Sequence, residues 1–183
     1  MAARPTPAEL AAAEGRPVPD VLEPGLRVLF CGINPGLWSA AVGHHFARPG
    51  NRFWKALQLG GLTPRLLAPD EEGELVGLGL GITNLVERAT AGAAELGGAE
   101  LRAGGARLAA KAAAAGPEVV AVLGVGAYRT AFDRPRAAVG PQPEEIGGSR
   151  AWLLPNPSGL NAHYQLPDLA EAFAALRRSK AVR

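Results

Sequence analysis

Cysteine, histidine and aromatic residues are all scarce in this sequence of 183 residues. The single cysteine, Cys31, excludes an internal disulfide and fits a reducing compartment, so we expect a cytoplasmic protein. Only three histidines are present, and the adjacent pair His44–His45 lacks the helical i, i+4 spacing of a zinc site, so we predict no metal. No apolar run reaches the ~18 residues of a membrane span, which argues against a membrane protein.

What is present fits one globular domain. A hydrophobic content of 48% and this length allow a substantial core. The first twenty residues lack the basic and apolar segments of a signal peptide. The net charge of +2 decides little about a nucleic-acid partner, because phosphate binding needs only a local basic face.

Strand-like and helix-like segments alternate along the chain. We interpret residues 1–24 as a loosely ordered arm with a short helix near 8–13, and residues 25–183 as one domain. The alternation predicts a single three-layer α/β/α domain with a mainly parallel, four- to five-stranded central sheet. We expect Trp38, Trp54 and Trp152 in its core rather than as platforms for nucleic acid, although Trp38 lies in the loop of the candidate site. The expected strands are 27–31, 78–83, 118–123 and 151–154, and the expected helices are 50–60, 100–115, 126–132 and 167–178.

Two Gly/Pro/Asn-rich segments directly follow predicted strands, at residues 31–36 and 154–161. Parallel strands bring such loops together at the carboxyl edge of the sheet, where open α/β folds bind ligands. The first loop carries the amide Asn34, which can hold a water molecule. The second ends in the apolar tip Leu160, which can enter a base stack. Asn34 alone is better explained as a turn cap, but the pair favours chemistry on an everted nucleobase.

Four segments, 31–36, 43–55, 81–88 and 155–160, resemble in order the mismatch-specific uracil/thymine-DNA glycosylase family of the uracil-DNA glycosylase superfamily. The resemblance implies the uracil-DNA glycosylase fold and hydrolysis of the N-glycosidic bond of uracil or thymine opposite guanine, which leaves an abasic site. It implies double-stranded DNA with a mismatched or damaged pyrimidine as partner. We expect a monomer without cofactor.

The resemblance assigns Asn34 and Thr90 to catalysis. Asn34 would position the attacking water, with help from Thr90, which taken alone is an ordinary loop residue. Related uracil-only enzymes carry an aspartate at the position of Asn34, so this chain is expected to act by positioning and to be slow. A glycosidic bond breaks through an oxocarbenium-like sugar, so a weakly activated water suffices if the leaving base is stabilised. Backbone N–H groups of residues 32–36 could supply that stabilisation.

A second group of residues matches the base pocket of the family. Phe46 would stack on the base, although a core phenylalanine is an equal alternative. Gly36 replaces a tyrosine that excludes 5-methyl groups in uracil-only relatives, so larger pyrimidines should fit. A turn that needs positive φ also explains the glycine, and both explanations can hold together. Asn84 would bond the pyrimidine edge. The predicted base-binding residues are Ile33, Gly36, His45, Phe46 and Asn84.

A third group matches the intercalation loop. Leu160 would fill the space left by the everted nucleotide, while the backbone of Gly159 and Asn161 reads the opposite guanine. Alternatively, Leu160 packs under the loop. The continuation Asn161-Ala162-His163 departs from the arginine-containing pattern of the family. The loop residues are Ser158, Gly159, Leu160 and Asn161, and the candidate phosphate contacts are Arg48, Arg52, Asn156 and His163.

Two other functions remain as alternatives. The weak catalyst Asn34 and the altered wedge fit a mismatch- or damage-binding protein with little turnover. Residues 124–128 form half of a dinucleotide-binding fingerprint but lack its third glycine. A Schiff-base lyase is not expected, because Lys55, on a predicted helix, is interpreted as solvent-exposed.

Overall fold

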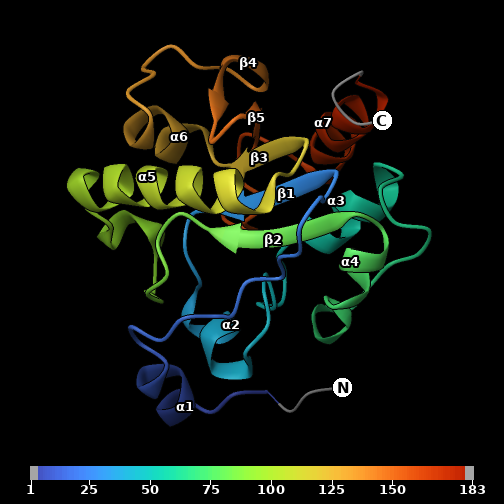
Figure 1. Cartoon of the computed structure of the whole chain (residues 1–183). Coiled ribbons are helices and arrows are strands. Elements are labelled where there is room, and N and C mark those ends of the chain that lie inside the picture. The colour runs from blue at the N-terminus through green and yellow to red at the C-terminus, as the bar shows by residue number, and fades with distance from the viewer. Residues whose placement is uncertain (1–3, 180–183) are drawn as a thin grey trace.

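The computed structural model describes residues 4–179, which form a five-stranded sheet flanked by helices (Figure 1). The predicted four- to five-stranded α/β/α domain is confirmed. The strands are β1 (Val28–Gly32), β2 (Leu80–Asn84), β3 (Val119–Leu123), β4 (Gly140–Ile146) and β5 (Ser149–Leu154). The helices are α1 (Pro7–Ala12), α2 (Leu37–Val42), α3 (Phe53–Leu59), α4 (Glu74–Gly77), α5 (Gly98–Ala115), α6 (Val125–Ala131) and α7 (Leu166–Arg178). Short 3-10 turns cover Pro69–Glu71 and Ala93–Glu95.

The strand order is β2-β1-β3-β5-β4, and every pair except β4–β5 is parallel. Each of the four parallel strands therefore ends at the same edge of the sheet. In register, Gly32 at the end of β1 lies opposite Asn84 at the end of β2. The loops that follow these strands are brought together by this pairing alone.

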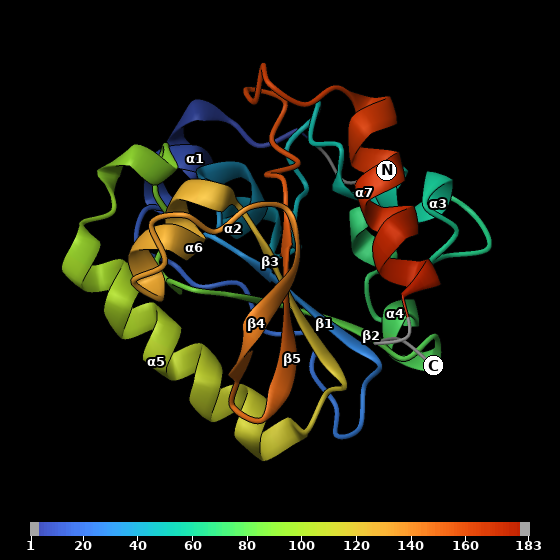
Figure 2. The same cartoon turned by 90° about the horizontal axis from the view of Figure 1, so that it is seen from above.

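Alternate residues of each strand enter two separate cores, as expected for a sheet covered on both faces. Val28 and Phe30 face α3, α4 and α7, whereas Leu29 and Cys31 face α5 and α6. Figure 2, seen from above, shows these two helix groups on opposite sides of the strands. Cys31 is fully buried, as predicted, and burial raises the pKa of its thiol, so it stays a protonated packing group.

The described part of the predicted arm, residues 4–24, makes defined contacts with the rest of the chain. Thr6 and Glu9 form a reciprocal capping box that starts α1. Ala13 and Val18 pack with Ala40 and Ala89 in a small third core. Val21 then pairs antiparallel with Ile82 and extends the edge of β2. The first three residues of the predicted arm lie outside the described part of the chain.

Sequence reasoning missed α2, the single-turn helix α4, and β4. Helix α2 occupies a stretch interpreted as loop, and β4 forms a fifth, antiparallel edge strand through Pro141 and Pro143. Proline is tolerated there because an edge strand leaves part of its N–H groups unpaired. Across residues 4–179, no helix combines the length and apolar character needed to cross a bilayer.

Two of the three tryptophans lie in the core as predicted, but Trp38 does not. Trp54 is 5% exposed and Trp152 is 7% exposed, and both belong to the core on the α3/α7 face. Trp38 is half-buried in α2, outside all three cores. It lies instead beside the carboxyl edge of the sheet.

Helix α5 approaches the sheet closely at Gly104, and this contact gives a stability prediction. A Cβ at Gly104 would lie 2.4 Å from the Leu85 carbonyl oxygen, a backbone atom that cannot move independently. Gly104→Ala should therefore lower the free energy of unfolding by about 1–3 kcal/mol, although alanine normally favours helices. Urea denaturation measures this.

The matched control is Gly126→Ala in α6, where an added Cβ meets nothing within 4 Å. That variant should be neutral or more stable by up to ~1 kcal/mol. Equal effects of the two substitutions would contradict the close approach of α5.

Candidate active site

The carboxyl edge of the sheet encloses a cavity of about 160 Å³. The segments after β1, β2 and β5 line it, together with the segment between α2 and α3. Asn34 and Leu160 both line this one cavity, as the two motifs predicted. The other predicted site residues that line it are Ile33, Gly36, His45, Phe46, Arg48, Asn84, Thr90, Asn156 and Ser158.

The Asn34 amide is held in one orientation. Its Nδ2 donates to the Arg88 carbonyl oxygen at 3.0 Å and to Thr90 Oγ1 at 2.8 Å. The Thr90 hydroxyl donates its own hydrogen to the Gly92 carbonyl at 2.9 Å, so it must accept from Asn34. Both partners are acceptors, and this forces the NH₂ group toward them. The amide oxygen Oδ1 is left without a partner among the described residues.

Thr90 is placed by the backbone. Its N–H donates to the Pro35 carbonyl at 3.2 Å, and residues 36 and 90 form an isolated parallel bridge. The side chain is 1% exposed. Thr90 therefore contacts Asn34 and the loop after it, which makes it a positioning residue for the amide.

Asn84 is oriented through His45. His45 Nε2 lies 2.9 Å from the Pro19 carbonyl oxygen, which can only accept, so this nitrogen carries the proton. In the neutral ring Nδ1 is then an acceptor, and it faces Asn84 Nδ2 at 3.4 Å. Pro19 thus sets the direction of the Asn84 amide through the His45 ring. His45 is only 2% exposed, and both of its ring nitrogens are engaged within the protein.

Phe46 has an unusual backbone conformation, with φ at 52°. A bulky residue rarely adopts this left-handed region, at a cost of order 1–3 kcal/mol. The ring stacks on Phe53 with centroids 4.1 Å apart. It is half-buried, packs against the sheet core and also lines the cavity, so both interpretations of Phe46 describe part of its environment.

Two glycines leave space for these groups. A Cβ at Gly32 would lie 2.6 Å from Asn84 Oδ1 and 3.2 Å from the Phe46 ring, so only glycine admits both. Gly36 has an ordinary φ of −77° as N-cap of α2, which excludes the positive-φ explanation for this glycine. A Cβ there would meet nothing within 4 Å. The glycine at position 36 keeps the cavity wall open.

The loop with Leu160 is fixed by its own polar groups. Asn156 Oδ1 accepts from the Ser158 N–H, and Ser158 Oγ accepts from the Leu160 N–H. Asn161 Nδ2 donates to the Asn156 carbonyl, and its backbone N–H donates to Ser158. Leu160 itself is 80% exposed, so the alternative in which it packs under the loop is wrong. The loop presents an apolar side chain to solvent on a preformed frame.

Arg52 braces this loop from the start of α3. Its guanidinium donates to the carbonyl oxygens of Pro157, Ser158, Asn161 and Tyr164. A phosphate contact would have to replace these bonds, and the phosphate contact predicted for Arg52 is therefore not supported by this geometry. Arg48 and His163 are exposed, with no ion pair among the described residues, and their phosphate contacts stay predictions.

Two polar lining residues, Ser39 and Asn51, were not among the predicted site residues. Ser39 is buried and its hydroxyl accepts from the Ala47 N–H, while Asn51 Oδ1 caps Phe53 N–H. Both line the cavity. They lie in or beside α2 and α3, and the former helix was not predicted.

The glycine-rich turn after β3 has a packing explanation. A Cβ at Gly124 would lie 3.0 Å from Ile33 Cδ1, so glycine lets the loop after β1 approach this turn. Tyr128, in the following helix, is buried and its hydroxyl donates to Glu144 at 2.6 Å. This segment supports the cavity from behind.

The chemistry available in the cavity is that of amides, hydroxyls and backbone groups. Within the described part of the chain, no three histidine, cysteine, aspartate or glutamate side chains come together as a metal site requires. Lys55 is exposed on α3, as expected, and no described lysine lines the cavity. The site can hold a neutral heterocycle and a water beside it.

Comparison with known proteins agrees with this arrangement. A family model, described as the uracil DNA glycosylase superfamily, matches residues 19–177. The chain belongs to the uracil-DNA glycosylase superfamily. Superfamily membership implies N-glycosylase activity on DNA, which makes the cavity between Asn34 and Leu160 the candidate place for the excised base.

A solved structure is similar in fold to this superfamily member. It is the solution NMR structure of a putative uracil DNA glycosylase from Methanosarcina acetivorans. The similarity covers 89% of this chain and 96% of that chain, with a TM-score of 0.56 and 19% sequence identity. The predicted uracil-DNA glycosylase-like fold is thereby confirmed.

The His45 environment gives a pH prediction. Burial lowers the pKa of His45 from its ordinary value of 6.5, because the charged ring loses hydration. The folded state therefore binds this proton less readily than the unfolded chain. The stabilising contribution is complete above the unfolded pKa and is lost as pH falls through the depressed folded pKa.

Urea unfolding at about pH 7.5 and about pH 5 tests this. His45→Asn should lose less stability on acidification than the wild type. The control His163→Asn, at an exposed histidine, should follow the wild type. The same acid dependence in all three proteins would contradict the assignment.

Proposed function

We propose that the protein is a monofunctional, mismatch-specific DNA glycosylase. It everts uracil from pairs with guanine and hydrolyses the N-glycosidic bond, leaving an abasic site. The observation that carries this proposal is the Asn34 amide, whose oxygen is left free on the wall of a cavity that also has the exposed Leu160 at its rim.

Asn34 holds the nucleophile in this mechanism. Its Oδ1 accepts a hydrogen from one water and aims the water oxygen at C1′ of the everted nucleotide. The C1′–N1 bond breaks with its electron pair going to the base, the water oxygen bonds to C1′, and the water proton passes to the base anion or solvent. An amide takes no proton, so the rate comes from positioning and from stabilising the leaving base.

The base binds between Phe46 and Asn84. The Phe46 ring offers a stacking face beside the cavity, and its strained backbone is held by Phe53. Asn84 bonds the pyrimidine edge, and His45 acts through Asn84 by fixing which end of the amide is the donor. Backbone N–H groups of the Gly32–Gly36 turn stabilise the negative charge on the leaving base.

The open wall at Gly36 supports a wide substrate range. No Cβ projects from this position, and there is empty space where one would lie. We therefore include thymine, ethenocytosine and other 5-substituted pyrimidines opposite guanine among the substrates. Base release from uracil, thymine, ethenocytosine and 5-hydroxymethyluracil, each opposite G and A, measures the range.

A second candidate is a mismatch- or damage-binding protein with little turnover. It is favoured by the neutral amide at position 34 and by the wedge continuation Asn161-Ala162-His163, which lacks arginine. Single-turnover release from a G·U duplex separates the two candidates. No release above that of Asn34→Ala would favour the binding protein.

Removing the amide should stop catalysis and spare binding. Asn34→Ala should lower single-turnover base release by about 10²-fold or more, because the water is no longer held. Duplex affinity should change little, since Asn34 contacts no phosphate. Gel-shift titration and base release on the same G·U duplex measure both, and equal losses in the two assays would contradict the role.

Thr90 should act through Asn34. Thr90→Val removes the hydroxyl that accepts from Asn34 Nδ2, and the side-chain amide of Asn34 can then rotate to the opposite orientation. Base release should fall by on the order of 10²-fold at saturating enzyme, with affinity retained. Thr90→Ser should restore most of the rate. A serine variant as slow as the valine variant would indicate a packing role only.

Leu160 should matter only in duplex DNA. Leu160→Ala removes an apolar group that replaces stacking, so release from a G·U duplex should slow by on the order of tenfold. Release from single-stranded uracil DNA should be unchanged. Stability should stay within about 0.5 kcal/mol, because the side chain is 80% exposed. Equal slowing on both substrates would remove the wedge role.

A further inference from the structure

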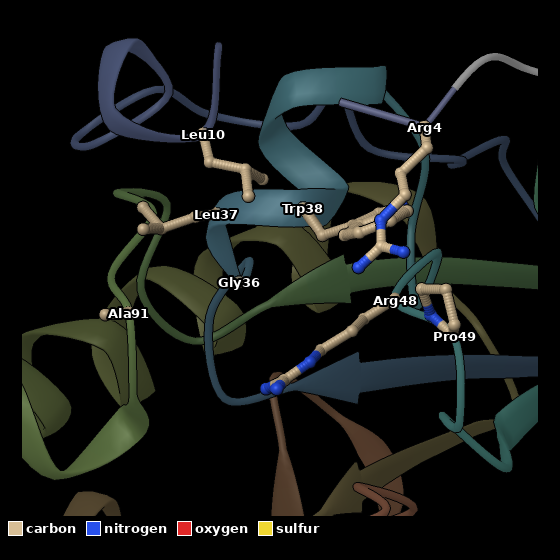
Figure 3. A pocket seen from close by; sticks show the side chains of 8 residues that line it. All are labelled: Arg4, Leu10, Gly36, Leu37, Trp38, Arg48, Pro49 and Ala91. Carbon is tan, nitrogen blue, oxygen red and sulfur yellow. The ribbon is translucent and has the colours of Figure 1, made fainter. Parts of the chain in front are cut away.

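A second hollow, of about 490 Å³, adjoins the base cavity (Figure 3). Gly36, Arg48 and Ala91 line both spaces, so the two adjoin at the carboxyl edge of the sheet. Pro49 also lines it, and its remaining walls come from the N-terminal segment, through Arg4 and Leu10, and from α2, through Leu37 and Trp38. None of these four residues belongs to the segments that carry the family resemblance in the base pocket.

Two guanidinium groups enter this hollow without an acidic partner. Figure 3 shows the Arg4 side chain over the Trp38 ring and Arg48 extending below it. Among the described residues neither arginine makes an ion pair or a side-chain hydrogen bond, and both are exposed. Unpaired cations beside an apolar floor suit a ligand with a phosphate and a sugar or base.

The Trp38 ring prepares Arg4 for such a ligand. The guanidinium carbon lies 5.7 Å from the ring centroid, a cation–π distance. This contact uses no N–H group of the guanidinium as a hydrogen-bond donor to an oxygen, so these groups can donate to a phosphate. The contact also restricts a long side chain before a ligand arrives, which lowers the entropy lost on binding.

The N-terminal segment is held firmly enough to place Arg4. The capping box between Thr6 and Glu9 begins α1 directly after it. Ala13 and Val18 then anchor the segment on Ala40 of α2 and on Ala89, next to Thr90. The same helix α2 carries Trp38, so Arg4 and its stacking partner share one support.

We infer that Arg4, stacked on Trp38, and Arg48 form a binding subsite for a backbone phosphate of the lesion strand beside the everted nucleotide. This rests on the proposed function. The shared lining of the two spaces assigns the strand, because a nucleotide held in the base cavity keeps its own flanking phosphates close to Gly36 and Ala91, which line both. Two arginines supply the charge complementarity, and Leu10, Leu37 and Trp38 contact the adjacent sugar.

A phosphate scan tests this subsite. Duplexes with one G·U mismatch carry a single neutral methylphosphonate at each phosphate flanking the uracil in turn, or at the matching phosphates of the opposite strand. Affinities are measured in an Asn34→Ala background, which keeps the DNA intact, with and without Arg4→Ala. At one lesion-strand phosphate, neutralisation should weaken binding at least about threefold with Arg4 present. It should weaken binding of the Arg4→Ala protein clearly less, because only Arg48 remains at that phosphate.

Salt dependence gives a second measurement. Arg4→Ala should make the negative slope of log K against log salt less steep by about 0.9. The loss of affinity relative to the unsubstituted protein should therefore shrink about threefold between 50 and 200 mM salt. Trp38→Leu should lose part of the same contact, and Trp38→Phe should restore it. The matched control is Arg16→Ala, an exposed arginine of the same segment that lines neither space.

Several results would overturn the subsite. Equal methylphosphonate sensitivity with and without Arg4 would mean that Arg4 only packs on Trp38. A lower free energy of unfolding of Arg4→Ala, with no change in DNA binding, would lead to the same conclusion. Sensitivity confined to the opposite strand would refute the assignment of strand. A positive scan in a protein that releases no base would overturn the enzymatic proposal only, whereas base release with a negative scan would overturn the subsite only.

Discussion

The parallel pairing of β1 with β2 is the constraint on which the site depends. It sets Gly32 opposite Asn84, so the amide of one strand lies over the glycine of the other. A one-residue slip would turn every side chain of β2 to the other face and remove Asn84 from the cavity. The two covered faces of the sheet prevent such a slip, because Leu80 and Ile82 are fully buried in one core.

The polar groups of the site are fixed by donors and acceptors that are already committed. The Thr90 hydroxyl donates its only hydrogen to the Gly92 carbonyl, and therefore Asn34 must turn its NH₂ group toward Thr90. Pro19 has only a carbonyl to offer His45, and therefore the ring accepts from Asn84. Neither amide needs a charge to be oriented. This arrangement suits catalysis by positioning, because preorganised neutral dipoles need little rearrangement during the reaction.

The segment from residue 13 to residue 21 contacts the sheet, α2 and His45. Pro19 anchors His45, Val21 extends the sheet beside Ile82, and Ala13 with Val18 supports α2. Through these contacts the segment bears on the Asn84 amide and on the wall that contains Trp38. The loop with Leu160 is supported separately, by Arg52 from the start of α3. Asn84 and Leu160 therefore line one cavity but are supported by different parts of the chain.

The sequence by itself determined the alternation of strands and helices, the buried faces and the two loops that meet at the sheet edge. These follow from local hydrophobic patterns and from Gly, Pro and Asn at strand ends, which act over a few residues. It could not show helix α2 or strand β4, because the first lies in a stretch read as loop and the second contains two prolines. Only the tertiary structure decided that Leu160 is exposed and that Arg52 binds the carbonyl groups of the loop around it. It also decided that Trp38 contacts Arg4 outside the core, and which way the Asn34 and Asn84 amides point. Each of these depends on a partner far away in sequence, and no local pattern records such a partner.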